Sequence, residues 1–109
     1  MLSRRLSDLP RQRACGRLVP VATGFRSRLL GLAGLSRARA GAGLLIPGCA
    51  AVHTFGMRFD LDLVFLDRHG RPLSVRRGLP PRRFARQRGA AAVLEIPAGE
   101  GGEFSAPRT

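Results

Sequence analysis

Residues 48–67, which read GCAAVHTFGMRFDLDLVFLD, hold one of the two cysteines, one of the two histidines and three of the seven acidic residues, side chains that could do chemistry. The thiol of Cys49 and the imidazole of His53, four residues apart, could bind a metal or act as a nucleophile and its base. If the segment is a β-strand, the two side chains lie on one face about 13 Å apart, too far for either task. We therefore predict no metal, no cofactor and no catalytic residue. His53 either bonds a carbonyl in a partly buried position or offers a polar group at the rim of a pocket.

The even-numbered positions of the same segment carry Thr54, Arg58, Asp60 and Asp62. One interpretation is a solvent face on which opposite charges pair with little energetic consequence. The alternative is a small polar site, in which Arg58 engages an anionic group and Asp62 orients the arginine or accepts a hydrogen bond. Gly56 on that face would allow a ligand or another backbone to approach closely.

Composition limits the classes of partner. All nineteen Lys and Arg positions are arginine and only seven residues are acidic, so the formal net charge is +12. Such an excess attracts polyanions without sequence preference. Aromatic residues are not interleaved with the arginines, and no nucleic-acid-binding motif is present, so dedicated nucleic-acid recognition is not predicted. No apolar run approaches the ~18 residues of a membrane span, and no secretory signal is evident, so we expect a cytoplasmic protein that does not use a membrane.

The pattern from Cys49 to Leu66 predicts how the candidate residues are held. Odd positions are apolar apart from His53, and the even positions 54–62 are polar or glycine, which is the period of a β-strand with its odd row buried. A straight strand of this length is implausible, so we expect a bend or connection near Phe59 to Asp62. Asp67 to Gly70 is a turn sequence, and we expect Leu63–Leu66 and Leu73–Val75 to pair as a hairpin.

Other elements follow from shorter signals. Thr23 is a candidate N-cap, and Phe25, Leu29 and Leu32 recur at helical spacing, which predicts a helix ending near Gly34. Further strands are expected at Arg17–Ala22, Leu44–Ile46 and Ala92–Ile96, with loops at 36–43 and 78–89. Together they predict one α+β domain over residues 15–99, mainly β: a mostly antiparallel, partly closed barrel-like or sandwich sheet with one short amphipathic helix. Residues 1–14 are expected to form a loose basic arm, and 100–109 a disordered polar tail.

Three motifs resemble the family named domain of unknown function 192. They are Arg28-x-x-Gly31-Leu32, then Phe55-x-Met57 with Leu61-Asp62-x-x-Phe65-x-Asp67-x-x-Gly70, and Val93-Leu94-Glu95-Ile96-Pro97-Ala98-Gly99. The resemblance covers residues 17–99 and implies a compact, mainly β fold, found mostly in bacteria and archaea, with no agreed activity. The sequence departs from the family at Ser27, where glutamate is usual, and after Gly99, where a final strand is usual. Arg28, the motif arginine, is a further candidate for an anion contact, or pairs with Asp62 or Glu95 to lock the helix to the sheet.

These observations favour a non-catalytic module that binds a small anionic ligand or a protein partner. The candidate binding residues are Arg28, His53, Thr54, Arg58 and Asp62. One alternative is a small enzyme that uses Asp62 as acid or base with Arg58 as its electrostatic partner. Another is a basic accessory protein that associates with nucleic acid nonspecifically. The sequence does not define an oligomeric state.

Overall fold

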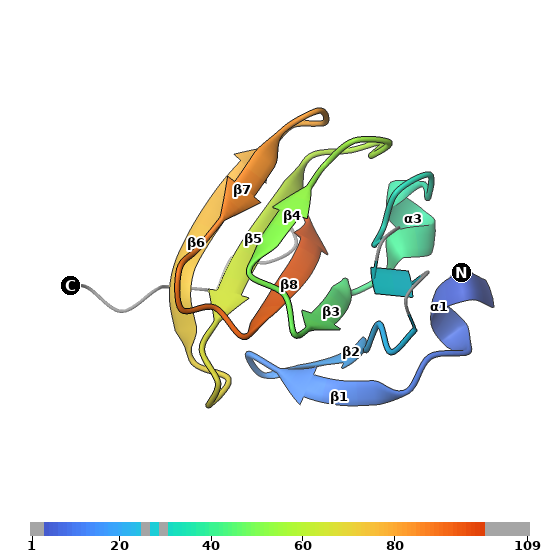
Figure 1. Ribbon diagram of the computed structural model, residues 1–109. Coiled ribbons are helices and arrows are strands. Elements are labelled where there is room, and N and C mark those ends of the chain that lie inside the picture. Colours follow the sequence, from blue (N-terminus) through green and yellow to red (C-terminus); the bar gives the residue numbers. More distant parts are fainter. Residues whose placement is uncertain (1–3, 25–26, 29–30, 100–109) are drawn as a thin grey trace.

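A four-stranded antiparallel sheet forms the centre of the fold (Figure 1). The computed structural model describes residues 4–24, 27–28 and 31–99. The sheet order is β3-β8-β5-β6, with β3 at Leu44–Pro47, β8 at Ala92–Pro97, β5 at Leu61–Leu66 and β6 at Pro72–Leu79. Two further antiparallel pairs are β1 (Arg11–Ala14) with β2 (Arg17–Pro20), and β4 (Ala51–His53) with β7 (Phe84–Arg86). The short helices are α1 (Arg4–Ser7) and α3 (Arg37–Ala40).

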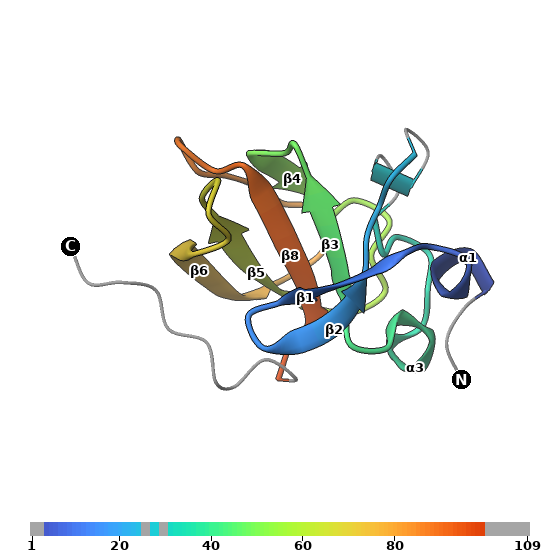
Figure 2. The same cartoon turned by 90° about the horizontal axis from the view of Figure 1, so that it is seen from below.

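The predicted class, α+β and mainly β with mostly antiparallel pairing, is confirmed, but the sheets do not close into a barrel. Figures 1 and 2 show both labelled helices beside β3, on the opposite side of the molecule from β6. Among the described residues, no helix combines the length and the apolar character that crossing a bilayer would require.

Both faces of the central sheet are covered, so β5 is buried at every position. On one face, Val64 packs with Val19 and Ala14 of the β1–β2 hairpin. Figure 2, seen from below, shows this hairpin crossing the ends of β8 and β3. On the other face, Phe65 and Leu63 belong to a second cluster, which includes Val52 of β4, Ala85 of β7 and the buried residues of the helical segments. Continuous burial therefore replaces the alternation expected of a half-exposed strand.

The hairpin between β5 and β6 is confirmed. Oδ1 of Asp67 accepts hydrogen bonds from the backbone amides of His69, at 2.8 Å, and Arg71, at 2.9 Å. Both bonds hold the pKa of the Asp67 carboxyl below its usual range, and the bond from Arg71 has the larger effect. Gly70 takes a φ of 78°, which a residue without a Cβ adopts without strain.

The predicted burial of the odd row is wrong over the first part of the segment. In β4 the even residue Val52 is buried, whereas Ala51 is exposed, and Phe55 is 48% exposed. The chain leaves the strand after His53 and turns, with Gly56 at a φ of 81°, before β5 begins. The expected bend therefore falls earlier than predicted, because β4 pairs with β7 and not with the continuation of its own strand.

Three predicted loops contain regular structure. Residues 4–14 are not a loose arm: they form α1 and β1, with Leu6 buried, and the guanidinium of Arg5 donates to the carbonyls of Gly31 (3.0 Å) and Ala33 (2.8 Å). The basic connection at 78–89 contains β7. The loop at 36–43 contains α3, which begins at the N-cap Ser36. Each element is only three or four residues long, too short to show a periodicity.

The predicted helix after Thr23 is described only in part. Ser27 and Arg28 are helical and Leu32 is fully buried, in agreement with the prediction. Phe25 and Leu29 lie outside the described residues, as do residues 100–109.

Candidate functional site

A small cavity of about 160 Å³ brings together two of the five predicted binding residues, Arg28 and His53. We call it the Glu95 cavity, after the most deeply buried charged group on its wall. Its lining comes from the helical segment, β3, β4 and β8: Arg28, Gly31, Ile46, Cys49, Ala51, Val52, His53 and Glu95.

Glu95 occupies a position at which the sheet would normally carry an apolar residue. On β8 it pairs in register with Leu44 of β3 and Leu63 of β5, both fully buried, and its own side chain is only 3% exposed. The backbone amide of Leu32 donates to its carboxyl. Gly31 allows this approach, because a Cβ there would lie 2.7 Å from Oε1 of Glu95.

The carboxyl of Glu95 is therefore only partly satisfied. Its Oε1 is buried without a hydrogen-bond partner among the described residues. Burial, which disfavours the charged form, raises the pKa of Glu95 from 4.5 to about 7, and the Leu32 amide opposes this rise. Near neutral pH the group consequently exists in both protonation states.

Three other polar side chains surround the cavity. Nδ1 of His53 is also buried with no hydrogen-bond partner in the described part of the chain. The thiol of Cys49 donates to the carbonyl of Ala51 at 2.9 Å, and Nη2 of Arg28 donates to the carbonyl of Gly48 at 3.0 Å. Within residues 4–24, 27–28 and 31–99, no group of three or more His, Cys, Asp or Glu side chains is arranged to hold a metal.

Thr54 has an internal role. It is fully buried, its Oγ1 donates to the carbonyl of Pro80 at 2.7 Å, and the same oxygen accepts from the amide of Arg83 at 2.8 Å. Its own amide donates to the Arg83 carbonyl at 2.8 Å. Thr54 therefore ties the end of β4 to the segment before β7.

Asp62 is also engaged within the fold. It is 2% exposed, Oδ1 accepts from the amide of Gly78 at 2.8 Å and Oδ2 accepts from that of Gly99 at 3.3 Å. Oδ2 also lies 3.6 Å from the guanidinium of Arg77. The carboxylate thus supports the irregular register between β5 and β6.

Arg58 is exposed. None of Thr54, Arg58 and Asp62 lines the Glu95 cavity.

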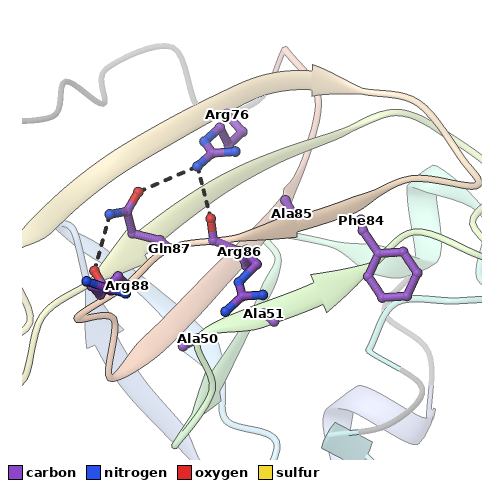
Figure 3. Close-up of a pocket in the computed structure, with 8 residues that line it drawn as sticks. All are labelled: Ala50, Ala51, Arg76, Phe84, Ala85, Arg86, Gln87 and Arg88. Carbon is purple, nitrogen blue, oxygen red and sulfur yellow. Dashed lines mark hydrogen bonds between the residues drawn. The ribbon is translucent and has the colours of Figure 1, made fainter.

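A larger, open groove of about 610 Å³ lies between β4, β6 and β7 (Figure 3). We call it the Arg76 groove; Ala51 lines both it and the Glu95 cavity. Its lining residues are Ala50, Ala51, Arg76, Phe84, Ala85, Arg86, Gln87 and Arg88.

Hydrogen bonds fix one arginine of this groove. The guanidinium of Arg76 donates to the carbonyl of Arg86 at 3.1 Å and to Oε1 of Gln87 at 3.5 Å, as Figure 3 shows, and lies 5.5 Å from the ring centre of Phe65. Arg86 and Arg88 are exposed. Residues 68–94 contain eight arginines and no Asp or Glu, so no acidic side chain of this segment neutralises the groove.

Aromatic rings lie beside these arginines. Phe84 stands between Arg83 and Arg86 in the sequence, so the prediction that no aromatic residue is interleaved with the arginines is wrong at this position. Phe84, on the groove wall, is 76% exposed, and its ring centre lies 5.9 Å from that of Phe55 and 6.3 Å from that of His53. The pairing of β4 with β7 creates this cluster, because His53 and Phe84 are register partners. From the sequence, Glu95 was named only as a possible ion-pair partner of Arg28, and the groove was not predicted; the only local signal for Glu95 as a site residue is a charge within an apolar strand.

Comparison with known proteins gives a family and a fold. The model of the family DUF192, described as an uncharacterised ACR, matches residues 11–105. No curated protein matches the chain. A solved structure of a proposed transcription regulator from Sinorhizobium meliloti 1021 is similar at a TM-score of 0.69 and 20% identity, over 89% of this chain and 84% of that one. A protein of unknown function from Novosphingobium aromaticivorans DSM 12444 is similar at 0.61 and 15% identity, over 94% and 91%. At these identities the likeness shows the fold alone.

Proposed function

Since the chain belongs to the DUF192 family, whose description assigns no activity, we propose its function from geometry: it is a non-catalytic module that binds a small anionic ligand in the Arg76 groove. The observation that carries this proposal is the convergence of three arginines and an exposed phenylalanine on one groove without an opposing carboxylate. The anionic ligand is the one expected from the sequence, but its site moves from Thr54, Arg58 and Asp62 to the groove between β4, β6 and β7.

The arginines suit an anion for two reasons. Arg76 is held by two hydrogen bonds, so little side-chain entropy is lost when it binds a ligand. Arg86 and Arg88 are exposed and present planar guanidinium groups that match phosphate or carboxylate oxygens. The strongly positive chain adds a long-range attraction that speeds the encounter.

The groove also limits the ligand. Its volume falls within the roughly 300–1,000 Å³ of small-molecule sites, and the Phe84 ring offers an apolar surface on its wall. A phosphate or carboxylate joined to a flat ring would use both features, as in a nucleotide. We therefore propose a ligand of that chemical class.

We expect the double variant Arg86→Gln/Arg88→Gln to bind such a ligand at least tenfold more weakly than the wild type. Each charge-assisted hydrogen bond contributes about 1.5–3 kcal/mol, and about 1.4 kcal/mol corresponds to a tenfold change. A thermal-shift panel of inorganic phosphate and nucleoside monophosphates would identify the ligand, and calorimetry would give the affinities. At 100-fold its dissociation constant, a ligand stabilises the wild type by about 2.7 kcal/mol.

The matched control is Arg11→Gln/Arg39→Gln, which removes the same charge from exposed positions on β1 and α3. This control should keep nearly wild-type affinity. If both double variants lost affinity equally, the attraction would come from net charge and not from a site in the groove.

A second candidate function, nonspecific association with single-stranded nucleic acid, is favoured by one observation. Phe55 and Phe84 are exposed beside arginines, an arrangement on which bases can stack while phosphates pair with guanidinium groups. An affinity that grew with strand length and fell steeply with salt would support this candidate over a small ligand. A protein partner that covers the same aromatic cluster is the third possibility.

An enzyme that uses Asp62 receives less support from geometry. Its carboxylate already accepts hydrogen bonds from two backbone amides and faces Arg77, so its lone pairs are engaged in holding the sheet.

Cys15 and Cys49 are free thiols, which accords with the cytoplasmic location that we propose.

A further inference from the structure

Two polar atoms on the wall of the Glu95 cavity are buried and unpaired: Oε1 of Glu95 and Nδ1 of His53, judged over the described residues. Native proteins leave few such atoms, and each calls for an explanation. The two belong to strands far apart in sequence, β8 and β4, and both residues line the same cavity.

The cavity is large enough for more than a single water molecule. Its volume of about 160 Å³ is close to that of an engineered cavity of about 150 Å³ that binds benzene. Its polar groups would hold either several waters or one compact molecule. A ligand that enters is therefore limited to a handful of non-hydrogen atoms, or to the terminal group of a longer chain.

The charges around the cavity select the chemistry of that group. An ionised Glu95 needs a hydrogen-bond donor, Arg28 can supply donors only, and Nδ1 of His53 can do either according to its tautomer. A cation would match Glu95 but would be repelled by Arg28 and by the net charge of +12. An anion would match Arg28 but would meet a buried carboxylate.

We propose that the Glu95 cavity is a binding site for a primary carboxamide, either a small amide or the terminal amide of a longer ligand. The NH₂ group donates to Oε1 of Glu95, and the carbonyl oxygen accepts from Arg28 or from a protonated Nδ1 of His53. A primary carboxamide carries donors and an acceptor on one compact neutral group, so it can match Glu95 together with Arg28 or His53 and places no net charge between them. This proposal does not depend on the Arg76 groove, whose ligand is an anion.

Three probes of nearly equal shape and different charge test the proposal: acetamide, acetate and acetamidinium. We expect acetamide to shift the amide resonances of Gly31, Cys49, His53 and Glu95 in the ¹⁵N-labelled full-length chain, saturably and in the millimolar range expected of so small a ligand. Acetate and acetamidinium should bind at least tenfold more weakly, as measured from the same resonances. Tighter binding of either ion, or no saturable shift with any probe up to about 100 mM, would overturn the proposal.

The protonation of Glu95 supplies a second, independent readout. The chain has three glutamates, so ¹³C labelling of glutamate carboxyls gives few signals, and the one lost in Glu95→Gln identifies Glu95. Because N–H donors favour the ionised form, saturating acetamide should lower the pKa of Glu95. Arg28, His53 and Cys49 also face the cavity, but the carboxyl signal reports Glu95 itself. An unchanged or raised pKa in the presence of acetamide would contradict the proposed contact.

The variants complete the test. Glu95→Gln should weaken acetamide binding by about tenfold, because a charge-assisted hydrogen bond becomes a neutral one. Asp60→Asn makes the same change in charge at an exposed position and should leave binding unaltered. If Glu95→Gln and Asp60→Asn bound acetamide equally well, Glu95 would not be the contact.

Discussion

Because of Glu95, the free energy of unfolding of the wild type is expected to fall by about 3 kcal/mol as the pH rises. Replacing Glu95 by glutamine is expected to remove this fall. The pKa of Glu95 is raised from 4.5 to about 7 in the folded protein. Between these values the folded state holds a proton that the unfolded state releases, so the contribution of Glu95 to stability falls as pH rises from 4.5 to 7 and is constant above. Each pKa unit corresponds to about 1.36 kcal/mol.

Urea unfolding of the wild type and of Glu95→Gln between about pH 4.5 and pH 8 measures this effect. The difference between the two proteins isolates Glu95, because the other titrating groups are common to both. We expect the variant to gain stability relative to the wild type as pH rises, whereas exposed Asp60→Asn should show no such gain. Parallel curves for the wild type and Glu95→Gln would mean that the carboxyl is already well satisfied in the folded state.

This expected loss of stability bears on function. Leu44 and Leu63 flank Glu95 in the sheet, so an apolar residue there would pack against apolar neighbours on both sides. A buried carboxyl with one unpaired oxygen lowers stability at neutral pH. A residue whose polarity conflicts with its apolar surroundings in this way is typical of functional sites. The closeness of Gly31, whose missing Cβ makes room for the carboxyl, shows that the surrounding chain accommodates the charge.

The parts of the fold that the sequence predicted are those with local signals. The β5–β6 hairpin followed from the turn at Asp67–Gly70, and β3 and β8 from short apolar runs that end at Pro47 and Pro97. The burial phase of β4 could not be predicted, because it is set by pairing with β7, about thirty residues further along the chain. The same distant pairing brings Phe84 to His53 and forms the wall of the Arg76 groove.

The candidate site shows the same division. Arg28 and His53 were selected as binding residues from the sequence and lie on one cavity. Glu95 was not selected as a binding residue, because its contact with Gly31 joins segments far apart in the sequence. Thr54 and Asp62 were assigned to one polar face by alternation. Both are buried instead. Asp62 lies in the central sheet, whose two faces are covered, and Thr54 is enclosed by the segment before β7, to which it bonds; each bonds to backbone groups of the fold.

Replacing Asp62 by alanine is expected to lower the free energy of unfolding by about 2–4 kcal/mol. The amides of Gly78 and Gly99 would lose their acceptor, and a hydrogen-bonded group left without its partner costs about 1–3 kcal/mol. Arg77 would also lose an opposite charge at 3.6 Å, but that guanidinium is half exposed, so its share is small. Denaturant unfolding at neutral pH gives the change directly.

Two further variants separate a structural role from a functional one. Asp60→Ala, at an exposed position two residues earlier, should change stability by no more than about 0.5 kcal/mol. Asp62→Asn keeps an oxygen that can accept from Gly78 but removes the charge, so it should be destabilised less than Asp62→Ala. Because Asp62 lines neither the Glu95 cavity nor the Arg76 groove, the folded Asp62→Asn protein should bind acetamide and the groove ligand as the wild type does. Wild-type stability combined with lost binding would instead place Asp62 in a functional site and revive the enzyme that the sequence suggested as an alternative.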